Sequence, residues 1–274
     1  MNLIQIDKDK CQRDRICGLE CPGKLIEFRG KGAFPSTIEN AAEFCIRCGH
    51  CVAVCPNGAL TLENISSEQL LRLDKNLLPG PEQVRHLLIS RRSIRTYKNK
   101  IVKREILEDL IGIAQYAPTG SNKQQVYWLV IEDPAESNRL AGLVVDWMKL
   151  LLEQTQDEAL SRRYQRIIKA WDNGVDRICR QAPHVIVAHA PENIPAAGTD
   201  CVIALSYLEL AAYSQGLGTC WAGYFNSAAN FYPPMQKALN LPEGHRSCGA
   251  LLIGYPVYGY QRIPTRNAAQ IIWR

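Results

Sequence analysis

Apolar residues recur with the period of an amphipathic helix in several segments of this chain. This period places apolar side chains on one face, so it predicts a helix wherever it is sustained. The segments are 81–90, 104–116, two long stretches within 134–182, and 199–214. The last segment is almost wholly apolar from Val202 to Ser214, so we expect a buried helix there.

Three shorter runs are apolar without a helical period. They cover 127–132, 182–191 and 248–256, and they are short enough to be buried strands. His184 and His189 lie in the second run. No nucleophile or metal-binding set accompanies these histidines, so we interpret them as structural residues. Cys179, Cys201, Cys220 and Cys248 are interpreted as small buried residues.

The first 65 residues follow a different pattern, with many cysteines and short apolar runs. Brief strands are expected after Cys21 and Cys55, each of which is followed by a proline turn. Pro79-Gly80-Pro81 interrupts the chain before the first long helix. We therefore expect a small domain over 1–65, a linker over 66–80 and a larger domain over 81–274.

Composition and charge narrow the class of protein. The 274 residues are 46% hydrophobic and 22% charged, as in an ordinary globular protein. A formal net charge of +5 is too small to indicate a nucleic-acid or membrane partner by itself. Neither a signal-peptide pattern nor an apolar run long enough to cross a bilayer is found, so a cytoplasmic location is expected.

Seven of the eleven cysteines lie before residue 56, and four of them form one run. Clustered cysteines in odd number, without a secretion signal, indicate metal binding rather than disulfides. Zinc is the main alternative to iron–sulfur, but the paired C-x₂-C knuckles of structural zinc sites are spaced differently. The run has the spacing C-x₂-C-x₂-C-x₃-C-P and consists of Cys45, Cys48, Cys51, Cys55 and Pro56.

An earlier group repeats this pattern with one substitution. Cys11, Cys17 and Cys21 align with the later run without gaps, and Asp14 occupies the position of the second cysteine. The pair resembles the two-cluster bacterial ferredoxins, in which the fourth cysteine of each run binds the cluster of the other run. The resemblance implies one cluster held by Cys21, Cys45, Cys48 and Cys51. The other would be held by Cys11, Cys17 and Cys55, with Asp14 as candidate fourth ligand.

Asp14 leaves the type of the second cluster open. A carboxylate is a harder ligand than a thiolate and binds the iron less firmly. The site is therefore expected to hold either a 4Fe–4S cluster with Asp14 bound or a 3Fe–4S cluster that has lost one iron. A 3Fe–4S cluster also results if Asp14 is a surface residue beside a vacant position. The first cluster is expected to be 4Fe–4S.

A dense basic segment follows the helix expected at 81–90. Residues 91–104 include seven lysines and arginines and no acidic residue. Taken alone, the segment indicates a solvated basic surface, with nucleic-acid binding as a further option. A helix follows, and then the polar loop Ala117-Pro-Thr-Gly-Ser-Asn-Lys-Gln124. In combination, Arg-Arg-Ser-Ile-Arg, the helix and this loop resemble the nitroreductase family of FMN enzymes.

The resemblance implies an α+β fold with a central mixed sheet flanked by helices, preceded by the ferredoxin-like domain. It also implies flavin-binding residues in both motifs. Fork-shaped guanidiniums and a hydroxyl suit the dianionic phosphate and the ribityl chain of FMN. These groups belong to Arg91, Arg92, Ser93 and Arg95. Asn122 and Gln124 match loop positions that contact the flavin, although Gln125-Val126 replaces the family's usual Pro-Trp.

A second motif, Gly216-Leu-Gly-Thr-Cys-Trp-Ala-Gly-Tyr-Phe225, also matches this family. By resemblance, the backbone of Cys220, Trp221, Ala222 and Gly223 lies along the isoalloxazine ring. An amide near Ala222 or Gly223 would face N5 of the flavin, and glycine allows this close approach. In the C-terminal tail, the resemblance assigns Arg266 to the FMN phosphate, with Arg262 as the alternative.

Together the resemblances imply a homodimeric, FMN-dependent oxidoreductase that reduces a small nitroaromatic or quinone-like molecule, with flavin-centred chemistry. Its clusters would relay electrons from an external ferredoxin, flavodoxin or NAD(P)H. One alternative is an NAD(P)H-dependent nitroreductase whose clusters are structural. The lack of a dinucleotide fingerprint discriminates weakly here, because the family takes nicotinamide directly over the flavin. The other alternative is a redox-sensing or electron-carrier protein without turnover.

Overall fold

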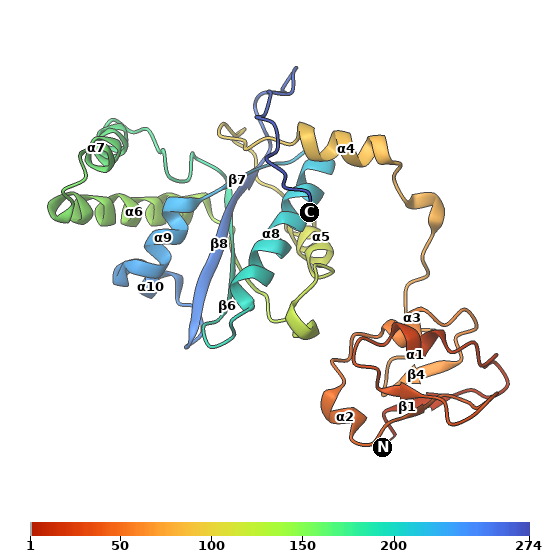
Figure 1. The fold of residues 1–274 in the computed structure, drawn as a ribbon. Helices are drawn as coiled ribbons and strands as arrows, with labels where there is room; N and C mark the ends of the chain where they lie inside the picture. Colours follow the sequence, from red (N-terminus) through yellow and green to blue (C-terminus); the bar gives the residue numbers. More distant parts are fainter. Residues whose placement is uncertain (1) are drawn as a thin grey trace. The chain divides into compact units, whose positions relative to one another are not determined.

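The computed structural model describes residues 2–274, which form two compact units (Figure 1). The smaller unit comprises the chain up to Pro79 together with Ser121–Lys123. The larger unit comprises Gly80–Gly120 and Gln124–Arg274. No described helix is both long and apolar enough to cross a membrane.

The smaller unit is built from short elements around a compact apolar core. Strands β1 (Ile4–Ile6) and β4 (Leu60–Leu62) pair antiparallel. Strands β2 (Ile26–Glu27) and β3 (Ser36–Thr37) form a second antiparallel pair. The helices are α1 (Ile16–Glu20), α2 (Ala41–Phe44) and α3 (His50–Ala53). Cys17 and Cys51 are buried within this core, whereas the other five cysteines of the unit are half-buried.

The segment before Pro79 contains one 3₁₀ turn, η1 (Lys75–Leu77). The Asp74 side chain caps this turn by accepting from the Asn76 amide at 2.9 Å. Leu71 and Leu77 around it are more than four-fifths exposed.

A four-stranded sheet forms the centre of the larger unit. Its spatial order is β5 (Tyr127–Ile131), β6 (His184–Pro191), β8 (His245–Gly254) and β7 (Gly218–Trp221). All three pairings of these strands are antiparallel. A parallel component comes from one isolated bridge between Ser93 and Thr219, at the β7 edge. The strands expected from the apolar runs are present, whereas the pattern did not predict β7.

Both faces of the sheet are covered, which explains why its central strands are apolar without alternation. Alternate side chains of β6 point to opposite faces: Val185 and Val187 face one core, and Ile186 and Ala188 the other. The first core also contains residues of α6 (Pro134–Gln154), α7 (Glu158–Asp172), α9 (Gly223–Phe231) and α10 (Pro233–Leu239). The second contains residues of α5 (Arg104–Ala114) and α8 (Ala197–Ser214).

Helix α8 is not buried on all sides within one chain. Leu205 and Leu208 are fully buried against the sheet, but Val202 and Tyr207 are about two-fifths exposed. Burial is thus complete on the face toward the sheet, and a single chain does not test burial of the opposite face between subunits. After β8 the chain has the isolated bridge Tyr97–Pro256 and no further helix or strand.

Helix α4 (Pro81–Ser90) begins at a proline, as expected, and Gln83 accepts a hydrogen bond from the Gly80 amide at 2.7 Å. A short 3₁₀ turn, η2 (Gly120–Asn122), lies in the polar loop. Helices α9 and α10 were not expected from the hydrophobic pattern. Pro233 at the start of α10 was the available local signal.

Candidate functional site

Four cysteines line one cavity in the smaller unit. The cavity measures about 150 Å³, and its cysteines are Cys21, Cys45, Cys48 and Cys51. Leu25, Leu62, Phe44 and Ile46 supply apolar walls. Cys21 comes from the first cysteine group and the other three from the second. The structure therefore brings together the four residues that the crossed ligation pattern predicts for the first cluster.

The electrostatics of this cavity favour a positively charged occupant. Burial, together with charge repulsion from the nearby Cys48, Cys21 and Cys45, raises the pKa of the Cys51 thiol to about 11. Four thiolates can coexist here if a cationic iron core compensates their charge. Within residues 2–274, no three His, Cys, Asp or Glu side chains converge as ligands of a single metal ion.

The remaining three cysteines and Asp14 form a second group. Burial raises the pKa of Cys17, and the charges of Asp14, Cys55 and Cys11 act on it in the same direction. In each run, the sulfur of the last cysteine accepts a hydrogen bond from the backbone amide four residues later. Leu25 donates its amide to Cys21 Sγ at 3.4 Å, and Ala59 donates to Cys55 Sγ at 3.3 Å. The two predicted ligand sets are therefore related by the internal repeat.

The loop that carries Asp14 has the backbone of the loop that carries Cys48. Arg13 and Arg47, which precede these residues, both lie in the left-handed region, with φ of 60° and 50°. Arg15 and Gly49, which follow them, have φ of 69° and 72°. A left-handed residue with a side chain costs about 1 kcal/mol, yet Arg15 adopts this conformation where the other loop has glycine. Asp14 thus occupies the equivalent position, although its Oδ1 also accepts from the Ile16 amide at 3.2 Å.

In the larger unit, the basic segment after α4 runs beside strand β7. The Ile94 amide donates to the Thr219 carbonyl oxygen at 2.8 Å. A β-carbon on Gly218 would lie 2.4 Å from Ile94 Cγ1, so only glycine permits this approach. The contact places the predicted phosphate-binding segment next to the predicted ring-binding segment. The predicted phosphate-binding residues are Arg91, Arg92, Ser93 and Arg95. The predicted ring-binding residues are Cys220, Trp221, Ala222 and Gly223.

A buried carboxylate on α8 connects the same two segments. Glu209 Oε1 accepts from Arg91 Nη1 at 3.1 Å and from Thr219 Oγ1 at 3.1 Å. Its Oε2 accepts from Trp221 Nε1 at 3.4 Å. Sequence analysis did not single out Glu209. The signal was available, because Glu209 is the only charged residue between Val202 and Ser214.

Arg92 has an unused donor at the site. Its two terminal nitrogens donate to the carbonyl oxygens of Arg91 at 2.7 Å and Ile89 at 2.6 Å. Its Nε is buried and has no partner among the described residues. Arg92 also lines a cavity of about 710 Å³. A buried N–H without an acceptor is costly, so this donor fits a bound anion such as a phosphate.

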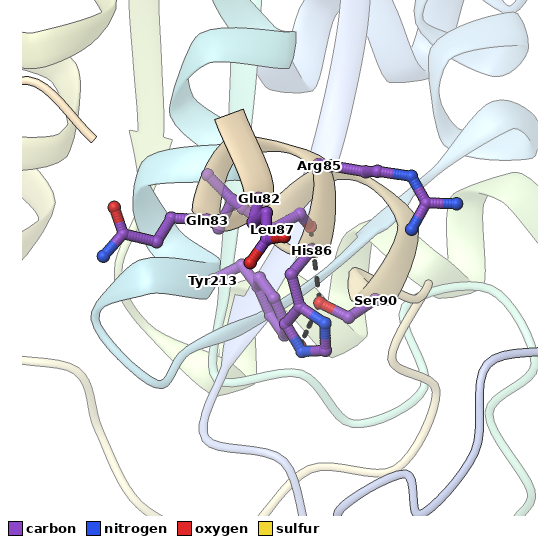
Figure 2. Close-up of a pocket in the computed structure, with 7 residues that line it drawn as sticks. All are labelled: Glu82, Gln83, Arg85, His86, Leu87, Ser90 and Tyr213. Carbon is purple, nitrogen blue, oxygen red and sulfur yellow. Dashed lines mark hydrogen bonds between the residues drawn. The ribbon is translucent and has the colours of Figure 1, made fainter. Parts of the chain in front are cut away.

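The cavity beside Arg92 is walled by the C-terminal tail. Tyr258, Tyr260 and Arg262 line it, whereas Arg266 does not. Arg266 is exposed, so within one chain the structure favours Arg262 over Arg266 as the tail arginine near the basic segment. A neighbouring pocket of about 740 Å³ lies along α4 (Figure 2). There the Tyr213 hydroxyl donates to Ser90 Oγ at 3.0 Å.

Positive charge also surrounds Cys220. Burial raises the pKa of this thiol, while the charges of Arg95 and Arg180 act in the opposite direction. Arg95 Nη1 donates to the Ser93 carbonyl oxygen at 3.3 Å. The Cys220 thiol is buried, as expected, and it stays protonated at neutral pH because burial dominates.

Two backbone amides, those of Ala222 and Gly223, follow the end of strand β7. Ala222 donates its amide to the Ala250 carbonyl oxygen at 2.9 Å. Gly223 is the first residue of α9, where amides have no partner within the helix. Gly223 is exposed, and a β-carbon there would meet nothing within 4 Å. Of the two candidates for a contact with flavin N5, the geometry therefore favours the Gly223 amide.

The polar loop is held by α8. The Gly120 amide donates to both carboxylate oxygens of the buried Asp200, at 3.1 and 3.2 Å. Gln124 donates its amide to Thr119 Oγ1 at 3.0 Å. Asn122 and Gln124 both have left-handed backbones, with φ of 54° and 51°. The loop is thus tightly turned at the two predicted flavin contacts, and Asp200 is an anchor that sequence analysis missed.

Two family models match this chain. The one described as the nitroreductase family matches residues 88–255, and the one described as a 4Fe-4S dicluster domain matches residues 3–56. These ranges contain the basic segment with β7 and all seven N-terminal cysteines, respectively.

Two relatives have similar sequences. Iodotyrosine deiodinase 1 of Sus scrofa is 24% identical over 190 residues, which are 67% of this chain and 64% of the deiodinase. The chain therefore spans less than two thirds of that protein. The Cr(VI) reductase of Pseudomonas sp. (strain G-1) is 27% identical over 190 residues, which are 69% of this chain and 73% of the reductase.

Two solved structures share the fold. A nitroreductase with bound FMN from Bacteroides fragilis NCTC 9343 has a TM-score of 0.58 and 21% identity. The match covers 70% of this chain and 97% of the nitroreductase chain. A nitroreductase with bound FMN from Desulfitobacterium hafniense DCB-2 has a TM-score of 0.56 and 22% identity. This match covers 71% of this chain and 100% of that nitroreductase chain. The expected fold class, α+β behind a ferredoxin-type domain, is confirmed.

Proposed function

The chain belongs to the nitroreductase family, and we propose that it is an FMN-dependent oxidoreductase that draws electrons through its own iron–sulfur clusters. The proposed substrate is a small nitroaromatic or quinone-like molecule. Two observations in one chain carry the proposal. One is the four-cysteine cavity, and the other is the basic segment hydrogen-bonded to β7. The relatives' names mention different substrates, so they do not select one for this chain.

In this proposal the larger unit binds FMN along β7. Arg91, Arg92, Ser93 and Arg95 would bind the phosphate and ribityl chain, and the Gly223 amide would donate to the ring. Asn122 and Gln124 contact the flavin from the polar loop. When bound, FMN supplies electron transfer in one- or two-electron steps. The fit rests on the unpartnered Arg92 donor and on the open space at Gly223.

The smaller unit would hold two clusters. Cys21, Cys45, Cys48 and Cys51 are the proposed ligands of a 4Fe–4S cluster, because they share one cavity. Cys11, Cys17 and Cys55 are the proposed ligands of the second cluster, with Asp14 at the fourth position. The shared loop conformation around Asp14 and Cys48 supports this assignment.

We propose a homodimer as the functional form. Val202 and Tyr207 leave an apolar strip of α8 exposed, and the tail leaves Ile272 and Trp273 more than four-fifths exposed. Large apolar side chains gathered on a surface favour contact with a second copy. Burial of the outer face of α8 would complete the burial that its sequence suggests. Arg266 could then reach a flavin site in the partner subunit.

An anaerobic rapid-mixing experiment tests the direction of electron entry. The full chain, loaded with FMN and iron–sulfur clusters, is mixed with a reduced ferredoxin or with NADPH, and cluster and flavin absorbance are followed separately. The proposal expects reduced ferredoxin to bleach the clusters before the flavin. The variant Cys48→Ser, which removes a proposed ligand of the first cluster, should slow flavin reduction by ferredoxin.

The alternative with structural clusters makes the opposite prediction. Rapid bleaching of the flavin by NADPH, with the clusters still oxidised and with Cys48→Ser as fast as the wild type, would favour it. A protein that neither binds FMN nor turns over a nitroaromatic compound would instead favour a redox sensor or electron carrier.

A further inference from the structure

Glu209 is a buried acid whose two oxygens accept from three side chains. Its side chain is 9% exposed, and it forms an ion pair of 3.1 Å with Arg91, which is 24% exposed. The other two donors, Thr219 Oγ1 and Trp221 Nε1, belong to β7. The acid therefore lies where α8 meets both segments of the proposed flavin site.

A buried carboxylate is tolerated when charge and hydrogen bonds compensate it, and here both conditions are met. Arg91 supplies the compensating charge, while Thr219 and Trp221 supply neutral donors. The dependence is mutual. Without the carboxylate, the Arg91 side chain would have no counter-charge and the Trp221 indole no acceptor among the contacts described above. Glu209 thus restrains two flexible side chains at once.

We propose that Glu209 is a positioning residue for the flavin, which fixes the Arg91 guanidinium and the Trp221 indole relative to each other. The inference rests on the proposed function, because it assumes that FMN binds along β7. A long arginine side chain loses conformational freedom when it binds a ligand, and a prior ion pair removes much of that cost. Glu209 would therefore strengthen FMN binding without touching FMN.

The ion pair also has an electrostatic consequence. Glu209 cancels the charge of Arg91, so the net positive charge for the phosphate comes from Arg92 and Arg95. A negative charge held close to the flavin disfavours the addition of electrons to it. Replacing Glu209 by a neutral residue should therefore shift the flavin midpoint potential to a more positive value.

The test compares FMN binding and flavin potential in four full-length proteins: wild type, Glu209→Gln, Arg91→Met and the double variant. We expect each single variant to bind FMN at least about tenfold more weakly than the wild type. The double variant should bind no more weakly than the weaker single variant, because both substitutions disrupt one unit. Glu209→Gln should also raise the midpoint potential.

The control is Glu158→Gln on α7. Glu158 forms an ion pair with Arg162 at 3.1 Å on the surface, where both side chains are more than two-thirds exposed. This variant removes an equal charge and should retain the wild-type affinity and potential. A folded Glu209→Gln protein with wild-type affinity and potential would overturn the proposal, as would multiplicative effects of the two substitutions.

If Glu209→Gln fails to fold, Thr219→Val gives a milder change, because it removes one neutral donor and leaves the ion pair. We expect FMN binding about threefold weaker in that variant, and unchanged binding would overturn the proposal. Failure of the wild-type protein to bind FMN would be a different result, since it would contradict the proposed function itself.

Discussion

The Ile94 amide donates to the Thr219 carbonyl oxygen at 2.8 Å, so the basic segment lies against the edge of the sheet like a short additional strand. This contact is what brings two motifs, far apart in the sequence, to one place. It depends on Gly218, where a β-carbon would lie 2.4 Å from Ile94 Cγ1.

The substitution Gly218→Ala should therefore damage both stability and FMN binding. The added methyl group forces Ile94 away from β7, and overpacking of this kind costs about 1–3 kcal/mol. Chemical unfolding and FMN titration of the full chain would measure the two effects. Gly112→Ala is the matched control, because the space around Gly112 in α5 is open. It should stabilise the protein by about 0.5–1 kcal/mol. Equal behaviour of the two variants would contradict this account.

The substitution Asp14→Cys should complete the second set of cluster ligands. The loop backbone already matches that of Cys48, so a thiolate at position 14 needs no rearrangement. We expect the iron content to rise and a 3Fe–4S paramagnetic signal to be replaced by that of a reduced 4Fe–4S cluster. Asp9→Cys, which adds a thiol at an exposed position nearby, should change neither quantity. An unaltered signal in Asp14→Cys would argue against a ligand position.

Acidification should destabilise the larger unit through His189. Burial lowers the pKa of this histidine from its ordinary value of 6.5 to about 4, with repulsion from His245 as a second cause. The Nδ1 atoms of the two rings are 3.0 Å apart, and Tyr127 stacks on His189. Because the folded pKa is depressed, the stabilising effect is complete above pH 6.5. It is lost as the pH falls from 6.5 towards 4.

The expected loss across this range is at most about 3 kcal/mol. Urea unfolding at pH 7 and pH 5 would measure it. His189→Gln should flatten the pH dependence, whereas His86→Gln, at an exposed position, should not. A wild-type slope in His189→Gln would assign the acid sensitivity to other groups.

Cys248 should be the most reactive thiol of the larger unit. A hydrogen bond from the Cys201 thiol lowers its pKa to about 7, and the positive charge of Arg246 acts in the same direction. Cys179, Cys201 and Cys220 are buried, whereas Cys248 is half-buried, so the expectation of a buried residue is not met at Cys248. Alkylation by iodoacetamide, followed by peptide mass analysis, should label Cys248 first. Cys201→Ser keeps a hydroxyl donor and should preserve most of this reactivity, and Cys201→Ala should lower it.

The local signals in the sequence were sufficient for the long elements and for both motifs. Continuous apolar runs predicted β6 and β8 because both faces of these strands are buried. The interpretation of His184 also agrees with its contacts. Val102 donates to its Nε2 at 3.0 Å, and its Nδ1 lies 2.9 Å from the Glu132 carbonyl oxygen. This histidine is fully hydrogen-bonded in the core.

The sequence patterns did not predict features that depend on residues far apart in the sequence. Strand β7 has only four residues, and its extended form comes from pairing with β8, where Gly218 faces Gly254. Glu209 and Asp200 are acids within an apolar helix, and their roles became visible only when their donors were placed. The tail arginine is a similar case, because local sequence does not show which residue of an irregular segment reaches the cavity.

The loops around Asp14 and Cys48 have the same backbone conformation although the residue at the ligand position differs. Since Arg13 and Arg15 hold the same left-handed conformations as Arg47 and Gly49, a single codon sets the proposed fourth ligand of the second cluster. A mutation of that codon would change the residue at position 14 without requiring a different loop conformation. Position 14 is therefore the place to inspect when related chains are compared for oxygen tolerance or cluster type.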